Sequence, residues 1–182
     1  MTVLLTIILL ASFFAFATFG AALIVALAGP DGQLEQKSEI ELHHSPEDVD
    51  AWLTDFGRIG RWSSQIRSCI PLEPVRPFEP GARYEAQLDL GGARVLVLMT
   101  VMDHVPGRRI RLLQQSPVME TETIYDLQPT PAGQTLLAVR SRSRLRGLLK
   151  FFAPSQRQPA QLRLDADLSE LRRQMDVHVS LH

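Results

Sequence analysis

The sequence is short of cysteine and of net charge, and both shortages limit what the chain can be. Cys69 is the only cysteine, so no intrachain disulfide can form and no cysteine pair can hold a metal. The net charge of −1 provides no overall field that would attract nucleic acid. The sequence also lacks a Gly-x-Ser-x-Gly elbow and a glycine-rich phosphate loop. We therefore predict no nucleic-acid partner, no cofactor and no metal.

Charged side chains are absent from residues 3–28. A helix of this length would reach roughly 39 Å, more than the roughly 30 Å core of a bilayer. We predict a transmembrane anchor at residues 1–29 and a polar linker at residues 30–37. The alternative is a cleaved secretory signal, because Ala26, Leu27 and Ala28 resemble a cleavage site. Against it, no basic residue precedes the apolar stretch, which is about twice the usual length.

The orientation of this single-pass protein follows from its few basic residues. Lys37 is the first one behind the apolar segment and none precedes it, which favours a cytoplasmic C-terminal domain. A stripe of small residues at helical spacing predicts packing against another helix in the membrane. The stripe consists of Ala11, Ala15, Thr18, Ala22 and Ala26. The alternative is that alanine is simply common in such segments.

Residues 38–177 are predicted to form one α+β domain, followed by a tail at residues 178–182. Ser45 and Pro46 begin a helix after a strand at residues 39–44, and a short helix with Trp62 follows. Alternating and turn-bounded segments then predict an antiparallel meander with strands at residues 83–90, 94–103, 109–115, 119–127 and 134–145. Leucines and a methionine at helical spacing close the domain with an amphipathic helix over residues 164–175.

Three segments of this domain are similar to a known family. They are Ser-Pro-Glu-Asp-Val at residues 45–49, Asp-Phe-Gly-Arg-Ile-Gly-Arg-Trp at 55–62 and Pro-Gly-Ala-Arg-Tyr at 80–84. Over residues 38–176 the chain resembles the polyketide cyclase/dehydrase branch of the START-like (SRPBCC) superfamily. The resemblance implies a helix-grip fold, in which a curved antiparallel sheet wraps around a long C-terminal helix. It also implies a hydrophobic cavity for a lipid, quinone or polyketide, but no particular enzyme activity.

The resemblance places Trp62 at the rim or wall of that cavity. Tyr84 and Tyr125 could present hydroxyls to a ligand, or be ordinary core residues. The residues that we expect to line the cavity are Trp62, Tyr84, Leu88, Tyr125, Leu168 and Leu171.

No catalytic residue is predicted. His43 and His44 are adjacent on a strand and point to opposite faces, so they cannot chelate a metal together. His104 precedes a Pro-Gly turn, which is typical of a solvated loop histidine. Cys69 is expected to be a small buried hydrophobe rather than a reactive thiol.

A basic strip and an apolar cluster lie next to each other in the sequence. Arg140, Arg142, Arg144 and Arg146 share one face of the last strand. If Gln128 faces Gln134, then Glu122 lies opposite Arg140 and Glu120 opposite Arg142, which leaves Arg144, Arg146 and Lys150 without obvious partners. With the apolar cluster Leu148, Leu149, Phe151 and Phe152, these three form a predicted membrane-facing lip. The alternative is that this cluster is packed inside as the first turn of the closing helix.

Residues 95–102 are apolar on both faces, so another protein, a loop or a neighbouring segment should cover the second face.

The sequence features taken together suggest three alternative functions. The first is a membrane-anchored, non-catalytic domain that binds a lipid, quinone or isoprenoid at the bilayer surface. The second is an accessory subunit that docks on an integral membrane protein, and the third is a cyclase or dehydratase.

Overall fold

The computed structural model describes residues 32–73, 78–90 and 92–179, which belong to one folded unit that starts at Gly32. The predicted anchor and the small-residue stripe therefore lie outside the described residues. Within the described ranges, no helix combines the length and hydrophobicity that crossing a membrane requires.

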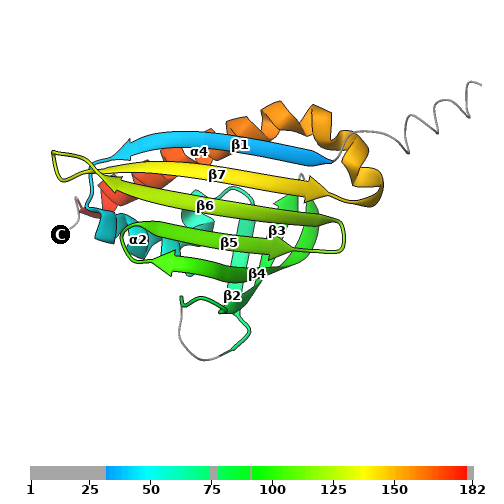
Figure 1. Cartoon of the computed structure of the whole chain (residues 1–182), viewed down its shortest axis with the longest axis horizontal. Helices are drawn as coiled ribbons and strands as arrows, with labels where there is room; N and C mark the ends of the chain where they lie inside the picture. Colours follow the sequence, from blue (N-terminus) through cyan, green and yellow to red (C-terminus); the bar gives the residue numbers. More distant parts are fainter. Residues whose placement is uncertain (1–31, 74–77, 91, 180–182) are drawn as a thin grey trace, which may run out of the picture. The chain divides into compact units, whose positions relative to one another are not determined.

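The fold is α+β, with one seven-stranded antiparallel sheet in the order β1-β7-β6-β5-β4-β3-β2. The strands are β1 (Gln33–Leu42), β2 (Ile66–Pro71), β3 (Arg83–Leu90), β4 (Ala93–Val105), β5 (Arg109–Gln115), β6 (Met119–Pro129) and β7 (Thr135–Leu145). The helices are α2 (Pro46–Thr54), α3 (Ile59–Trp62), the 3-10 helix η1 (Gly147–Phe152) and α4 (Ala153–Val179). In Figure 1 the sheet is in front, and α2 and α4 lie behind it. This arrangement is the predicted helix-grip fold.

Most predicted elements are confirmed. Ser45 caps α2 by accepting from the Asp48 N–H at 3.2 Å, and Pro46 occupies the first helical turn. Leu90 pairs with Ala93 across the predicted two-residue turn. The spacing of Leu164, Leu168, Leu171 and Met175 does place them on the buried side of α4.

The prediction of a linker at residues 30–37 is wrong from Gln33 onward. Those residues extend β1, which pairs with β7 from Gln33 opposite Arg144 to Leu42 opposite Thr135. Leu34 and Gln36 point inward and are buried, while Gln33, Glu35 and Lys37 alternate with them and are exposed. The tail also starts later than predicted, because α4 continues to Val179. Strand β2 was missed because its residues show no regular alternation of burial.

The core fills only one end of the space between the sheet and α4. Leu137 and Val139 of β7 point inward there and are buried, together with Leu171 and Met175 of α4. Two residues further along β7, the inward positions become Ser141 and Ser143, and on β6 they become Thr121 and Thr123. These side chains are small, so the sheet and the first half of α4 leave space between them.

The chain enters the folded unit beside the end of β7. Gly32 has φ +64°, and its carbonyl accepts from the Leu145 N–H at 2.8 Å. A Cβ placed on Gly32 would collide with the Leu145 carbonyl oxygen and lie 2.9 Å from Lys150 Cβ. The entry point is therefore packed against the end of β7 and against Lys150 of η1.

We predict that Gly32→Ala lowers the free energy of unfolding by about 2 to 3 kcal/mol, because it combines left-handed strain with a backbone collision. Gly133→Ala is the matched control, since Gly133 has φ +76° but open space around a Cβ. It should cost about 1 kcal/mol. Chemical denaturation measures both, and equal losses would show that residue 32 is not packed against β7.

Candidate ligand cavity and neighbouring surfaces

A cavity of about 500 Å³ lies between the sheet and the first half of α4. This volume is within the range of small-molecule sites in proteins. Three strands and one helix supply most of the wall. The lining residues of the sheet are Leu34, Gln36, Ile66, Leu88, Gln114, Met119, Thr121, Thr123, Tyr125, Ser141, Ser143 and Leu145, and the residues from α4 are Gln156, Ala160, Arg163, Leu164, Asp167 and Leu168.

The mouth of this cavity is apolar. Leu149 and Phe152 of η1 line it and are 37% and 57% exposed, so the cavity reaches solvent at this point. Leu148 is 79% exposed on the same 3-10 helix. The alternative prediction, in which this cluster is packed inside as the first turn of the closing helix, is therefore wrong. Residues 147–152 form a separate 3-10 helix before α4, and Figure 1 shows it at one end of the sheet.

A belt of hydroxyl groups crosses the cavity wall behind the mouth. The Thr121 hydroxyl donates to Ser143 Oγ at 2.9 Å, and the hydroxyls of Thr123 and Ser141 are 3.3 Å apart. These pairs satisfy one another across β6 and β7. The wall therefore combines apolar surface with polar atoms that already have partners.

Aromatic and acidic side chains form the inner part of the cavity. Trp62 is 6% exposed, and its Nε1 has no hydrogen-bond partner among the described residues. Asp167 Oδ1 accepts from the Ser64 N–H at 3.0 Å, which ties α4 to the end of α3. Burial raises the pKa of Asp167, although hydrogen bonds from Ser64 and Ser63 and the charge of Arg163 oppose this change. Burial and the nearby Asp167 also raise the pKa of Tyr125.

Because the pKa of Asp167 is raised, the stability of the fold should depend on pH. The folded chain binds the Asp167 proton more tightly than the unfolded chain does. As the pH rises above 3.8, the ordinary pKa of an aspartate, and then through the raised pKa of the folded state, ionisation of Asp167 lowers the stability of the fold. Between about pH 4 and pH 7, the stability of the wild type should therefore fall relative to Asp167→Asn. Thermal unfolding of both proteins over this range measures the difference. Parallel pH profiles would contradict the prediction.

The structure brings together four of the six predicted cavity residues, namely Trp62, Leu88, Tyr125 and Leu168. Tyr84 and Leu171 must be corrected, because they lie outside the cavity wall. Tyr84 is 4% exposed and packs edge-on against Phe56, with ring centroids 4.6 Å apart. Leu171 lies in the half of α4 that is buried in the core, where it is fully inaccessible.

Sequence reasoning missed the polar part of the wall. The signal was present in β7, where Ser141 and Ser143 alternate with the outward arginines and follow the inward Leu137 and Val139. Inward serines in an otherwise apolar series indicate a cavity rather than a filled core. In α4, Asp167 lies one residue before Leu168 and reaches the same cavity.

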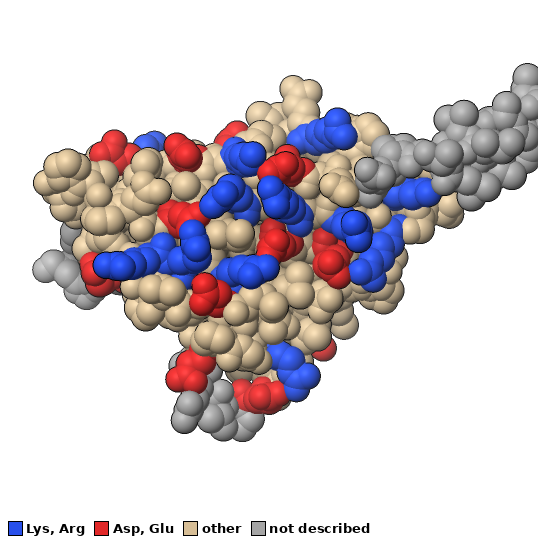
Figure 2. Space-filling view, viewed as in Figure 1, with Lys and Arg blue, Asp and Glu red and all other residues tan. Residues whose placement is uncertain are grey.

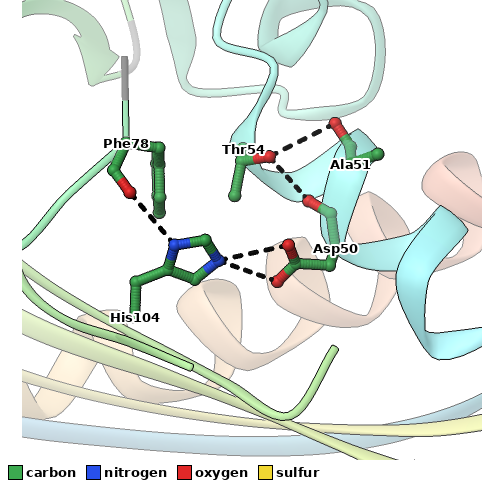
Figure 3. A network of polar contacts seen from close by, with 5 residues as sticks. All are labelled: Asp50, Ala51, Thr54, Phe78 and His104. Carbon is green, nitrogen blue, oxygen red and sulfur yellow. Dashed lines mark hydrogen bonds and ion pairs between the residues drawn. The ribbon is translucent and has the colours of Figure 1, made fainter. Parts of the chain in front are cut away.

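His104 is not the solvated loop residue that the sequence suggested. The register of β4 shifts between Val101 and Asp103, and this bulge turns His104 toward the inside. As Figure 3 shows, Nε2 lies 3.1 Å from both carboxylate oxygens of Asp50, and Nδ1 lies 3.0 Å from the Phe78 carbonyl oxygen. Both contacts are made when each ring nitrogen carries a proton. The pair lies outside the cavity wall and joins α2 to β4.

Cys69 is half-buried, and burial raises the pKa of its thiol to about 12. A thiol with this pKa is a poor nucleophile at neutral pH. Among the described residues, no group of three or more His, Cys, Asp or Glu side chains is arranged to hold a metal.

The outward face of the sheet carries ion pairs rather than a free basic strip, and Figure 2 shows acidic and basic side chains interleaved over it. The predicted pairs were two residues out of register, because Pro129 pairs with Thr135 and a loop of the predicted length starts one residue later in the chain. Glu122 therefore lies opposite Arg142, and Glu120 lies opposite Arg144. Arg140 bonds to Asp126 at 2.8 Å, Arg142 to Glu35 at 3.4 Å and Arg146 to Glu120 at 2.9 Å.

The second face of β4 is open in the described structure. Leu96 is 57% exposed and Met102 is 43% exposed, and on β2 the nearby Ile70 is 60% exposed. The side chains that were expected to need a cover therefore remain accessible to solvent.

Comparison with known proteins agrees with this geometry. The family model described as "Polyketide cyclase / dehydrase and lipid transport" matches residues 33–176. The chain belongs to this family. A search of curated protein sequences found no match.

Solved structures of other proteins align with most of this chain. A START superfamily protein from Mycobacterium smegmatis is 17% identical, with a TM-score of 0.64 over 78% of this chain and 97% of that chain. A conserved protein from Geobacillus kaustophilus is 20% identical, with a TM-score of 0.64 over 79% and 95%. The di-domain ARO/CYC StfQ from the steffimycin biosynthetic pathway is 12% identical, with a TM-score of 0.63 over 81% and 52%. At these identities the likeness establishes the fold.

Proposed function

We propose that this protein is a membrane-anchored domain that binds an apolar small molecule, such as a lipid, quinone or isoprenoid, without catalysing its conversion. The cavity of about 500 Å³ with its apolar mouth carries this proposal. A packed domain of this size would ordinarily fill such a space with side chains, because protein interiors are close-packed. The description of the family, which includes lipid transport, agrees with an apolar ligand.

The mouth of the cavity is also the end of the domain at which the chain enters. Gly32 is packed beside Leu145 at the end of β7 and beside Lys150 of η1. Residues 29–31 separate the apolar segment 3–28 from Gly32, and three residues span at most about 10 Å. An anchor made by that segment would therefore hold η1 and the mouth close to the bilayer, on the cytoplasmic side if the positive-inside rule holds.

The exposed side chains of η1 suit such a position. Leu148 and Phe152 would enter the interface, while Arg144 and Lys150 lie nearby and can approach anionic headgroups. An apolar ligand could then move between membrane and cavity without crossing bulk water.

Organic extraction tests this function directly. The full chain, purified in detergent from its own membrane, should release one apolar molecule per polypeptide, identified by mass spectrometry. An extract that contains only the detergent and the bulk membrane lipids, in their ordinary proportions, would contradict the proposal.

A second candidate function is that of an accessory subunit of a membrane complex. It is favoured by the exposed outward residues Ile70, Leu96 and Met102, which another protein could cover. This function predicts that the full chain co-migrates with a large assembly in native gels. Leu96→Lys should then abolish the co-migration. If the unsubstituted chain already migrates as a monomer, this function is excluded.

A further inference from the structure

Residues 147–158 form a segment between two firmly attached points of the fold. Before it, the Arg146 N–H donates to the Val118 carbonyl at 2.8 Å. After it, the Gln161 side chain bonds to both backbone groups of Lys37, to the N–H at 3.3 Å and to the carbonyl at 2.8 Å. Figure 1 shows the segment at the end of the sheet where β7 ends. The segment is therefore held at both of its ends.

Between these points the segment is weakly packed. No residue of η1 is buried, and Ala153 is the only buried residue from 147 to 158. Further along α4, by contrast, Leu168, Leu171 and Met175 belong to the hydrophobic core. Lifting the segment would expose only one fully buried side chain, a methyl group, so the hydrophobic cost of this movement is small.

A hinge residue lies at each end of the segment. Gly147 has φ +59° and no atom within 4 Å of the position of a Cβ, so the backbone can rotate there without a collision. Pro159 lies inside α4 and has no N–H, so the Ser155 carbonyl lacks the bond that residue 159 would ordinarily donate. Helices bend where this bond is missing. The residues between the two hinges can therefore turn as one unit.

The same segment carries the mouth of the cavity. Leu149, Phe152 and Gln156 line the cavity and follow one another at helical spacing, so they share one face. Gln156 Oε1 accepts from Arg163 at 3.3 Å, which joins the segment to the fixed part of α4 across Pro159. A turn at the two hinges would move the three lining side chains away from the cavity together.

We infer that residues 147–158 are a lid, which swings on Gly147 and Pro159 to open the cavity to its ligand. The bond between Arg163 and Gln156 is the latch of this lid. The inference rests on the proposed function, since it describes how a molecule enters the same cavity.

Hydrogen exchange of the ligand-free full chain in lipid nanodiscs tests the movement. The amides of Arg157 and Gln158 lie inside α4 and have helical acceptors, so a firmly packed helix would protect them. The reference is the buried part of the same helix at Leu168 and Leu171. If the segment opens, the amides of Arg157 and Gln158 should exchange at least about 100-fold faster than this reference.

Pro159→Ala tests the hinge. It supplies the missing N–H, so it should slow the exchange of residues 157 and 158 by about 10-fold. Pro154→Ala is the matched control, because Pro154 lies at the start of α4, where the Lys150 carbonyl already accepts from the Ala153 N–H. The control should change the exchange by less than about threefold.

Binding kinetics test whether the movement admits the ligand. Fluorenone, a neutral apolar ketone, is the probe, and empty nanodiscs give its partition into lipid. Stopped-flow mixing follows the tryptophan fluorescence, since Trp62 lines the cavity. Pro159→Ala should slow association and dissociation alike by about 10-fold and leave the dissociation constant within about twofold of the wild type. A change in a fixed wall would instead alter the affinity, and Pro154→Ala should retain the rates of the wild type.

The contrary outcomes are distinct. If the amides of Arg157 and Gln158 exchange as slowly as the reference, or if Pro159→Ala binds fluorenone at the rates of the wild type, the lid is disproved and the proposed function stands. If fluorenone does not bind to the wild type, the proposed function is contradicted and the lid inference falls with it.

Discussion

Replacing Ala160 by phenylalanine should lower the affinity of the full chain for the neutral apolar probe fluorenone by about 10- to 100-fold. Ala160 lies on the inward side of α4 and lines the cavity. A phenyl ring at this position would occupy part of the space of about 500 Å³ that the ligand needs. Steric conflicts of this kind cost about 1 to 3 kcal/mol, which corresponds to the expected loss of affinity. Isothermal titration in nanodiscs measures it.

Ala166→Phe is the matched control for this experiment. Ala166 lies on the same helix but is exposed, and it does not line the cavity. The same substitution there should leave the affinity within about twofold of the wild type. If both variants bind fluorenone as the wild type does, the ligand does not enter this cavity.

Removing one side of the His104–Asp50 pair should lower the free energy of unfolding by about 3 kcal/mol. The side chains are only 14% and 12% exposed, so the remaining partner would be left buried without its counterpart. Asp50→Ala leaves Nε2 of His104 without an acceptor, and His104→Phe leaves the Asp50 carboxylate without a donor. The double variant should lose less than the sum of the two single losses. Chemical denaturation of all three proteins completes the cycle.

The His44–Asp176 pair provides a comparison with similar chemistry. Its Nε2–Oδ1 distance is 3.0 Å, but the Asp176 side chain is 49% exposed. Water can replace the donor that His44→Phe removes from Asp176, so the loss of the pair in this variant should cost less than about 1 kcal/mol. Additive losses in the His104–Asp50 cycle would show that this pair does not couple α2 to β4.

Local sequence signals predicted most of the fold. The Ser45-Pro46 start, the two-residue turn after Leu90 and the spacing of the leucines in α4 each depend on a few neighbouring residues. The first part of β1 could not be recognised in this way. Residues 33–37 are mostly polar, and pairing with β7 is what makes them a strand.

The candidate site was only partly predictable, because small shifts in register decide which residues face inward. A bulge in β4 turns His104 from the outside to the inside, and a hairpin loop that starts one residue later than predicted moves each glutamate of β6 to a different arginine of β7. The inward residues of α4 could be recognised from their spacing. Their division into a filled core at Leu171 and an open cavity at Ala160 depends on the size of the facing side chains on β6 and β7.

The cavity also distinguishes a ligand-binding domain from a docking scaffold. A scaffold needs only the outer surface, whereas a binding protein needs the space behind Leu149 and Phe152 to be occupied. The hydroxyl groups of the inner wall and the apolar mouth suit one molecule with a polar end inside and an apolar end at the mouth.

Native mass spectrometry of the full chain, purified gently in detergent, shows directly whether the cavity holds a ligand. The expected species is a monomer that carries one additional mass of lipid or quinone size, which is retained in Ala166→Phe and lost in Ala160→Phe. A bare polypeptide, or a chain bound to larger proteins with no small-molecule mass, would contradict this expectation.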